Sequence, residues 1–292
     1  MECLSQEEAF EFVSDVLKIG GLREKLQKNR LLLLEELLQA YRARLPFQNV
    51  TLLSLSPEQR HVPTWKEIRA NIMQGRGGLC YTMSVFMKYL LDALEFKTCF
   101  LACSMRGAPD NHIATAVFDL TEKGSMHFVD PNAYPNFRAI PLDFKEESPV
   151  YEYSYLQFKF VKKGNVLLRL HRSTSPVAVL EELSADQWFQ VCEINLTPQE
   201  LPYFEPSMHT VFTVPGKNSP FLVQFRAAVF TDLKLVAFKD KIMLLEREDH
   251  TLEELKMVSR EEMIGKVLKY FPQFTEAEVT KAIDSVKLFP IQ

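Results

Sequence analysis

The sequence of 292 residues predicts an α+β fold built from three consecutive regions. Apolar residues recur at helical spacing over roughly the first 95 residues, whereas from about Lys97 the period changes to two, which is typical of strands. A third region, from Leu196 onward, combines further strands with two helices. We therefore expect an N-terminal helical region (1–95), a central antiparallel sheet or barrel (96–195) and a mixed C-terminal region (196–292).

Capping motifs indicate where the N-terminal helices begin. Ser5 with Glu8, and Thr64 with Glu67, have the spacing of capping boxes, in which each side chain bonds the other's backbone N–H. Apolar residues follow at helical spacing in each case. Four helices are expected, starting at Ser5, at about Asn29, at Thr64 and at about Leu79.

Alternating apolar and polar residues predict the strands. Gly, Pro, Asn and Asp separate the alternating segments, as expected for turns. In the centre these segments are 98–102, 112–118, 125–129, 155–161 and 165–169. The C-terminal strands are expected at 221–230, 234–238 and 242–245, followed by helices at 260–270 and 275–286.

Composition and charge restrict the class of function. The net charge is −4 without a basic stripe, which gives no reason to expect nucleic acid or an anionic membrane as a partner. The acidic, polar N-terminus is unlike a secretory signal, and no apolar run is long enough to span a bilayer, so we expect a cytoplasmic protein. We also expect a monomer. Five cysteines and six scattered histidines lack metal-ligand spacing, so we expect reduced thiols and no metal site.

The strongest functional signal is the run Arg76-Gly77-Gly78-Leu79-Cys80. A helix is expected to begin there, which would place Cys80 where unpaired N–H groups and the helix dipole stabilise an anion. The thiolate is the nucleophilic form of cysteine. Gly77 and Gly78 allow the backbone to approach the sulfur, and their N–H groups are candidates for holding an oxyanion.

Two residues downstream could activate this thiolate. His112 is expected to open a strand after the loop 106–110, and Asp130 is expected to close a strand before Pro131. Both would then lie at one rim of the sheet, where Asp130 would fix the tautomer of the imidazole. Taken singly, the three residues fit ordinary roles as a buried small residue, a sheet residue and a turn residue. Together with the glycine loop, they predict a Cys80, His112, Asp130 triad.

These segments resemble the arylamine N-acetyltransferase family. Residues 76–80 are similar to its Arg-Gly-Gly-x-Cys motif, and residues 46–49, Pro-Phe-Gln-Asn, are similar to its Pro-Phe-Glu-Asn segment. His112 and Asp130 fall where the family has its other two catalytic residues, and residues 193–198 and 212–221 resemble its entry to the third domain. The resemblance covers nearly the whole chain and is strongest over residues 29–130.

The resemblance implies a helical bundle (1–95) carrying Cys80, a β-barrel (96–195) carrying His112 and Asp130, and an α/β lid (196–292), with a cysteine-triad core of the transglutaminase or papain type. It implies transfer of an acetyl group from acetyl-coenzyme A, a co-substrate rather than a bound cofactor, to an arylamine-type amine or hydrazine. In this ping-pong mechanism Cys80 forms a thioester, His112 moves protons and Asp130 orients His112.

Coenzyme A is implied between barrel and lid. Contacts are expected at Thr213, Gly216, Lys217 and Ser219, where Gly216 and Lys217 could meet phosphate. An ordinary solvated turn is the alternative for this loop.

Three departures from the family pattern concern the same region. Gln48 replaces the glutamate, so a neutral hydrogen bond to Arg76 is expected instead of an ion pair. Where the family has Cys-x-Glu-x-Asn, this chain has Thr82 in place of the glutamate and Ser84 in place of the asparagine. The family's Asp-Val-Gly-Phe-Gly is replaced by Asp130-Pro131-Asn132-Ala133-Tyr134, which is expected to reshape the acceptor pocket.

Two other functions remain open from the sequence. Cysteine triads also occur in hydrolases and in enzymes that form amides from other thioesters. Because of the departures at Gln48, at Thr82 and after Asp130, a coenzyme A-binding protein of the same fold with reduced activity is a further possibility.

Overall fold

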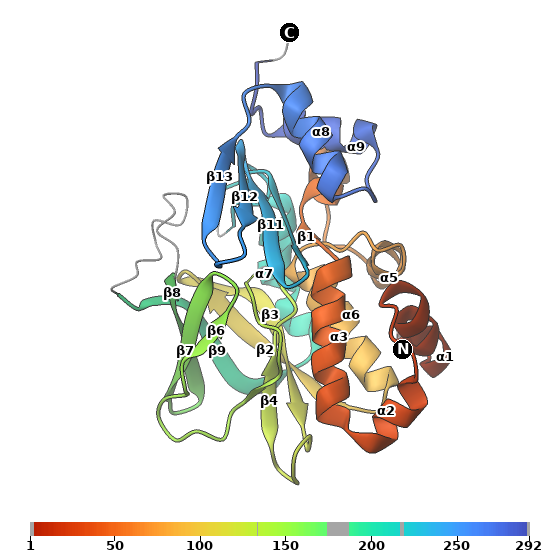
Figure 1. The fold of residues 1–292 in the computed structure, drawn as a ribbon, viewed down its shortest axis with the longest axis vertical. Coiled ribbons are helices and arrows are strands. Elements are labelled where there is room, and N and C mark those ends of the chain that lie inside the picture. The colour runs from red at the N-terminus through yellow and green to blue at the C-terminus, as the bar shows by residue number, and fades with distance from the viewer. Residues whose placement is uncertain (1–2, 133, 174–186, 217–218, 291–292) are drawn as a thin grey trace.

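The computed structural model describes residues 3–132, 134–173, 187–216 and 219–290. It confirms the predicted α+β fold: helices lie beside a curled antiparallel sheet, and a second sheet with two helices packs on top of both (Figure 1). None of the helices within these ranges is long and apolar enough to cross a membrane.

The predicted capping residues start the N-terminal helices. Ser5 and Thr64 form complete capping boxes, Asn29 caps through its side chain, and Leu79 is the N-cap of the helix that begins with Cys80. The helices are α1 (Gln6–Glu11), continued by a π-helical turn (Phe12–Val16), then α2 (Leu22–Lys28), α3 (Arg30–Arg44), α4 (Val50–Leu53), α5 (Trp65–Met73) and α6 (Cys80–Ala93). A 3₁₀ turn (Pro57–Gln59) precedes α5.

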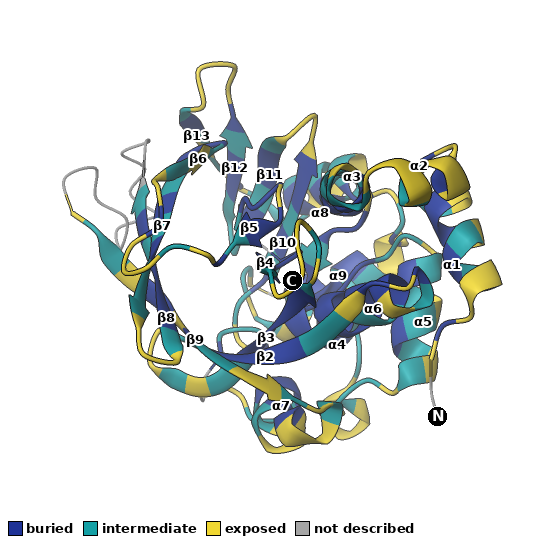
Figure 2. Cartoon of the chain, turned by 90° about the horizontal axis from the view of Figure 1, so that it is seen from below, coloured by how far each residue is buried: buried dark blue, intermediate teal, exposed yellow. Residues whose placement is uncertain are grey.

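The central sheet is fully antiparallel and curls into a half-barrel (Figure 2). Its strands, in spatial order, are β5 (Ile140–Pro141), β4 (Met126–Val129), β3 (Ala108–Phe118), β2 (Lys97–Met105), β9 (Phe189–Gln199), β8 (Val166–Ser173), β7 (Leu156–Lys163) and β6 (Tyr151–Tyr153). Helix α6 packs against β2 and β3.

The hairpin between β2 and β3 is tighter than predicted. Arg106 and Gly107 both have positive φ, so two residues reverse the chain and β3 begins at Ala108. The expectation that His112 opens a strand is therefore wrong, because His112 lies inside β3 opposite Cys103. The strand ending at Val129, just before Asp130, is as predicted.

The second sheet joins the segment after α3 to the C-terminal part of the chain. Its order is β1 (Phe47–Gln48), β10 (Arg226–Thr231), β11 (Lys234–Lys239), β12 (Ile242–Glu246) and β13 (Leu252–Lys256). The predicted strand 221–230 is shorter at its start, because the Asn49 side chain donates to the carbonyls of Phe221 and Gln224, each at 2.7 Å, and holds them in a turn.

Four further helical segments lie in the described C-terminal part of the chain. A 3₁₀ turn (Leu201–Phe204) and α7 (Glu205–Thr213), which the sequence analysis did not predict, follow β9, and α7 packs against β3. Helices α8 (Arg260–Tyr270) and α9 (Glu276–Ser285) match their predicted positions. Their apolar faces share a hydrophobic cluster with β10–β12 and with Val50 and Leu53 of α4. Helix α9 is thus held against α4 in the N-terminal part of the chain.

Candidate active site

Cys80 occupies the predicted position at the start of a helix. Leu79 is the N-cap, and the first helical hydrogen bond runs from Met83 N to Leu79 O at 3.0 Å. The amide N–H of Cys80 consequently has no acceptor within the helix. The side chain is buried, with Sγ 3.8 Å from the carbonyl oxygen of Asn111 at the rim of β3.

The loop before Cys80, residues 74–79, requires two of its glycines, Gly77 and Gly78, for close packing. Gly77 has a φ of +65°, and a Cβ there would lie 1.9 Å from the carbonyl oxygen of Pro46. Gly78 donates its N–H to that same oxygen at 3.1 Å and accepts from Gln48 N at 3.0 Å. The suggestion that the Gly78 N–H holds an oxyanion is therefore wrong, because Pro46 already accepts its hydrogen.

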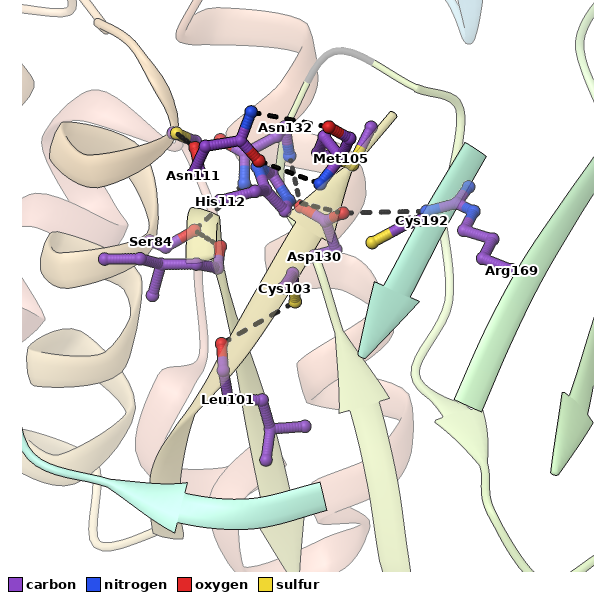
Figure 3. Close-up of polar contacts among 12 residues, drawn as sticks. Ser84, Leu101, Cys103, Met105, Asn111, His112, Asp130, Asn132, Arg169 and Cys192 are labelled. Carbon is purple, nitrogen blue, oxygen red and sulfur yellow. Dashed lines mark hydrogen bonds and ion pairs between the residues drawn. The ribbon is translucent and has the colours of Figure 1, made fainter. Parts of the chain in front are cut away.

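The structure brings His112 and Asp130 together beside Cys80. His112 Nε2 lies 3.1 Å from Asp130 Oδ2 (Figure 3). The imidazole also interacts with the Cys80 side chain. Burial of the imidazole lowers its pKa, but the charge of Asp130 and the bonds to Asp130 and Cys80 outweigh burial, so the pKa of His112 is well above its usual range. The protonated ring is thus favoured at neutral pH.

Two buried arginines flank Asp130, and sequence reasoning missed both. Arg42 of α3 donates to the main-chain oxygens of Asp130 at 2.6 Å and Asn132 at 2.5 Å, whereas Arg169 Nη1 of β8 lies 3.6 Å from Asp130 Oδ2. Burial raises the pKa of Asp130, yet His112, Arg169 and Arg42 together hold it well below its usual range. Burial lowers the pKa of Arg42 to about 9, which still leaves it charged.

We call Arg42, His112, Asp130 and Arg169 the charge cluster. All four are buried, and its three basic groups surround one carboxylate. Within the described residues, Nε and Nη2 of Arg169 have no hydrogen-bond partner. The guanidinium instead faces aromatic rings, with the Phe158 centroid at 4.6 Å and the Tyr134 centroid at 5.7 Å.

A polar network connects the charge cluster to helix α6. Asn132 Nδ2 donates to Asp130 Oδ1 at 2.6 Å and to Ser84 Oγ at 2.9 Å, and Ser84 Oγ donates to Ile113 O at 2.7 Å (Figure 3). Ser84 and Asn132 occupy two of the positions that depart from the family pattern. The spacing of Ser84, four residues after Cys80 and so on the same helical face, was a usable signal.

The segment after Asp130 meets the inner face of β8. Ala133 lies outside the described residues. The Tyr134 ring packs edge-on against the His171 ring at 4.5 Å between centroids. Burial lowers the pKa of His171 well below its usual range, so this ring is neutral.

The residues suggested for coenzyme A lie at and after the end of α7. Thr213 is the last residue of α7, and its hydroxyl donates to His209 O at 2.7 Å. Gly216 forms an exposed turn with a φ of +70°, Ser219 is buried, and Lys217 lies outside the described residues. The preceding Phe212 packs edge-on against Tyr81, beside Cys80, with centroids 6.3 Å apart.

Comparison with protein families identifies the chain. A sequence model described as N-acetyltransferase matches residues 30–272. The chain belongs to the N-acetyltransferase family. The match includes Cys80, His112 and Asp130 and ends at Pro272, before α9.

Solved structures of arylamine N-acetyltransferases share the fold. The enzyme from Mycobacterium abscessus has a TM-score of 0.75 at 14% identity, covering 96% of this chain and 94% of that one. The Mycobacterium marinum enzyme in complex with CoA has a TM-score of 0.73 at 17% identity, covering 94% and 97%. The Salmonella typhimurium enzyme has a TM-score of 0.73 at 13% identity, covering 97% and 99%. A comparison with curated protein sequences finds no match.

These findings confirm the resemblance to the arylamine N-acetyltransferase family, with the chain as a divergent member. The family consists of acetyl-coenzyme A-dependent transferases, so the predicted enzyme class is confirmed as well.

Proposed function

We propose that this protein transfers an acetyl group from acetyl-coenzyme A to an amine or hydrazine of the arylamine type through a thioester on Cys80. The observation that carries the proposal is the position of Cys80, at the start of a helix and beside the His112 imidazole, whose Nε2 lies 3.1 Å from Asp130 Oδ2, in a chain of this family.

In the first half-reaction the Cys80 thiolate attacks the carbonyl carbon of the thioester. The new bond from Sγ to carbon forms, the bond from carbon to the coenzyme A sulfur breaks, and His112 gives its proton to that leaving sulfur. The Cys80 N–H, which has no helical acceptor, is suited to stabilise the oxyanion during the attack. Acetyl-Cys80 and neutral His112 remain.

In the second half-reaction the amine nitrogen attacks the acetyl carbon of the Cys80 thioester. His112 takes a proton from the nitrogen, the bond from Sγ to carbon breaks, and the amide leaves. The thiolate and the protonated imidazole are thereby restored. Asp130 stays ionised and holds the ring in place, which its lowered pKa supports.

Coenzyme A binding is proposed at the loop after α7. The contact between Phe212 and Tyr81 brings this segment next to the nucleophile, and Ser219 Oγ has no partner among the described residues. Thr213 lies at the C-terminal end of α7, where the helix dipole disfavours phosphate. We therefore assign phosphate contacts to Gly216, Lys217 and Ser219, and only a neighbouring contact to Thr213. We propose that the protein acts in the cytoplasm as a monomer. Light scattering would check the oligomeric state.

Intact-mass analysis after exposure to a panel of acyl-coenzyme A donors tests the proposal. One acetyl mass is expected on the wild-type chain and on Cys3→Ala, which removes an exposed cysteine, and none on Cys80→Ala. A folded wild-type chain that takes no acyl group from any donor would contradict the proposal, as would an adduct that persists in Cys80→Ala.

The same assay separates the two alternatives. Release of free acid without an amine, faster than amide formation, would indicate a cysteine-triad hydrolase. Tight coenzyme A binding without thioester formation would indicate a binding protein.

A further inference from the structure

Arg76, four residues before Cys80, directs its side chain away from the nucleophile and toward the C-terminal helices. Its Nη2 lies 2.5 Å from Glu278 Oε1 of α9, and Nη1 donates to Gln273 O at 3.3 Å. The guanidinium also lies over the Phe274 ring, 5.0 Å from its centroid. The two charged side chains are only 16% and 29% exposed, so water screens their interaction less than it would at the surface.

Gln48 interacts with a different part of Arg76 than the sequence predicted. Its amide donates to the main-chain oxygen of Arg76 at 3.1 Å and to Thr51 Oγ1 at 2.9 Å. Among the described residues, the carboxylate that pairs with the Arg76 guanidinium is Glu278, outside the matched range 30–272. Glu278 of α9 thus supplies the negative charge that the neutral Gln48 lacks.

We propose that Glu278 is a positioning residue for the nucleophile, acting through Arg76 on the loop 74–79. This inference rests on the proposed function, in which the sulfur of Cys80 attacks the acetyl donor. The loop is fixed on one side by the hydrogen bonds of Gly78 to Pro46 and Gln48. The Arg76–Glu278 pair fixes it on the other side and makes the alignment of Cys80 with His112 depend on the docking of α9.

A hollow separates the first residues of the loop from the segment after α8. Gln74 and Gly75 line one wall of a space of about 460 Å³, and Tyr270, Pro272 and Gln273 line another. The hollow leaves one side of Gln74 and Gly75 unpacked, although their N–H groups donate to Ala70 O and Ile72 O of α5. The Arg76 contacts with Gln273 and Glu278 attach the loop to the C-terminal helices. Their loss would loosen the loop on that side, while the main-chain hydrogen bonds to α5 and those of Gly78 stayed in place.

Glu278 can be altered without removing the cap of its own helix. Its Oε2 accepts from Thr275 N and from Thr275 Oγ1, each at 2.8 Å, in a capping box, whereas Oε1 serves Arg76. Glutamine also functions at this capping position, so Glu278→Gln removes the charge and keeps the cap. Asp284→Asn is the matched control: Asp284 lies on the same helix and pairs with Arg260, at 2.6 and 2.7 Å.

The test measures Cys80 alkylation by iodoacetamide, single-turnover acetylation and amide hydrogen exchange of residues 75–79. Glu278→Gln is expected to slow alkylation and acetylation about tenfold, because small displacements of reacting groups are costly, and to raise the exchange rate in the loop. The KM for acetyl-coenzyme A should stay unchanged while kcat falls. Asp284→Asn should leave both rates within about twofold of wild type, since it does not touch the loop.

Several outcomes would overturn the proposal. Equal rates for Glu278→Gln and wild type, or equal losses in Glu278→Gln and Asp284→Asn, would show that Glu278 has no positioning role. The double variant Arg76→Gln/Glu278→Gln must be no slower than Arg76→Gln alone, because both changes remove one contact. If the wild-type chain forms no thioester, the proposed function fails, but alkylation and hydrogen exchange still decide the role of Glu278.

Discussion

Charged groups hold the surroundings of Cys80 from two sides, and the two sides differ in burial. On the barrel side, the charge cluster of Arg42, His112, Asp130 and Arg169 is buried. On the loop side, Arg76 and Glu278 keep 16% and 29% of their side-chain surface exposed. Both sides use opposite charges at hydrogen-bond distance, so burial is the physical difference between them.

This difference determines what each side can contribute. Breaking a buried ion pair leaves a charge without compensation and costs about 3–5 kcal/mol, whereas exposed pairs contribute about 1 kcal/mol or less. The barrel side is therefore suited to setting protonation states, which depend on large interaction energies. The loop side is suited to fixing a position, which requires little energy when the backbone is already held by Gly78.

The largest expected effect is that of Asp130→Asn on the barrel side. Acetyl transfer should fall about 10³- to 10⁴-fold, as when the orienting carboxylate of a triad is replaced elsewhere. The charge of Asp130 raises the pKa of His112, so its removal should lower that pKa in an NMR titration. Asp143→Asn, an exposed change after β5, is the control.

The same variant should alter the pH dependence of stability. The folded-state pKa of His112 lies above the unfolded value of about 6.5, so its stabilising contribution is complete below that pH. The contribution disappears as the pH rises through the folded-state pKa. In Asp130→Asn this decline should be weaker, and an unchanged His112 titration would mean that the charge cluster does not control the imidazole.

Next in size is Gly77→Ala on the loop side. A Cβ at position 77 would lie 1.9 Å from the Pro46 carbonyl oxygen, and the new alanine would have to keep a φ of +65°. Strain and overpacking together should cost about 3–4 kcal/mol in urea unfolding. Gly75 has a φ of +71°, but a Cβ there would have no heavy atom within 4 Å, so Gly75→Ala should cost only about 1 kcal/mol. Equal costs would show that the contact with Pro46 relaxes freely.

Local features of the sequence predicted the elements more reliably than the contacts between them. Capping boxes at Ser5 and Thr64 involve residues three apart, so they are visible in the sequence alone. The pairing of β1 with β10 joins Phe47 to Ala228, and no local pattern encodes such a distant partner. Strand β9 was also missed, since the adjacent buried residues Val191 and Cys192, and the exposed Pro198, interrupt its alternation.

For the candidate site, the sequence predicted the residues that carry the chemistry but not those that support them. Cys80, His112 and Asp130 have reactive side chains in a recognisable order. Arg169 had a detectable signal, because a charged residue stands among the apolar residues Leu167, Leu168 and Leu170. Arg42 had none, since an arginine on a helix is normally exposed. Glu278 acts across the fold on Arg76, which only the packing of α9 makes possible.

The two arginines of the charge cluster should differ in effect, which refines the comparison within the barrel side. Arg42→Met leaves the carbonyls of Asp130 and Asn132 without their donor and should cost about 3 kcal/mol in urea unfolding. Arg169→Met keeps the contacts with aromatic rings, removes one of three cations around a single carboxylate, and should cost less than about 1 kcal/mol.

The pH profile provides a second measurement on Arg169→Met. Arg169 helps to hold the pKa of Asp130 low, so its loss should move the acid limb of activity to higher pH. A loss of stability as large as that of Arg42→Met would contradict the view that Arg169 is an excess charge.

The smallest expected effect on activity concerns the connection between α6 and the charge cluster. Ser84→Ala removes the donor to Ile113 O and the acceptor of Asn132 Nδ2, which should cost about 1 kcal/mol in thermal or urea unfolding. Asn132 keeps its 2.6 Å bond to Asp130 Oδ1, so single-turnover acetylation should fall less than about threefold. If Ser84→Ala instead lost activity on the scale of Asp130→Asn, the orientation of Asp130 would depend on α6 itself. The division into a barrel side that sets protonation and a loop side that sets position would then be wrong, because one helix would govern both.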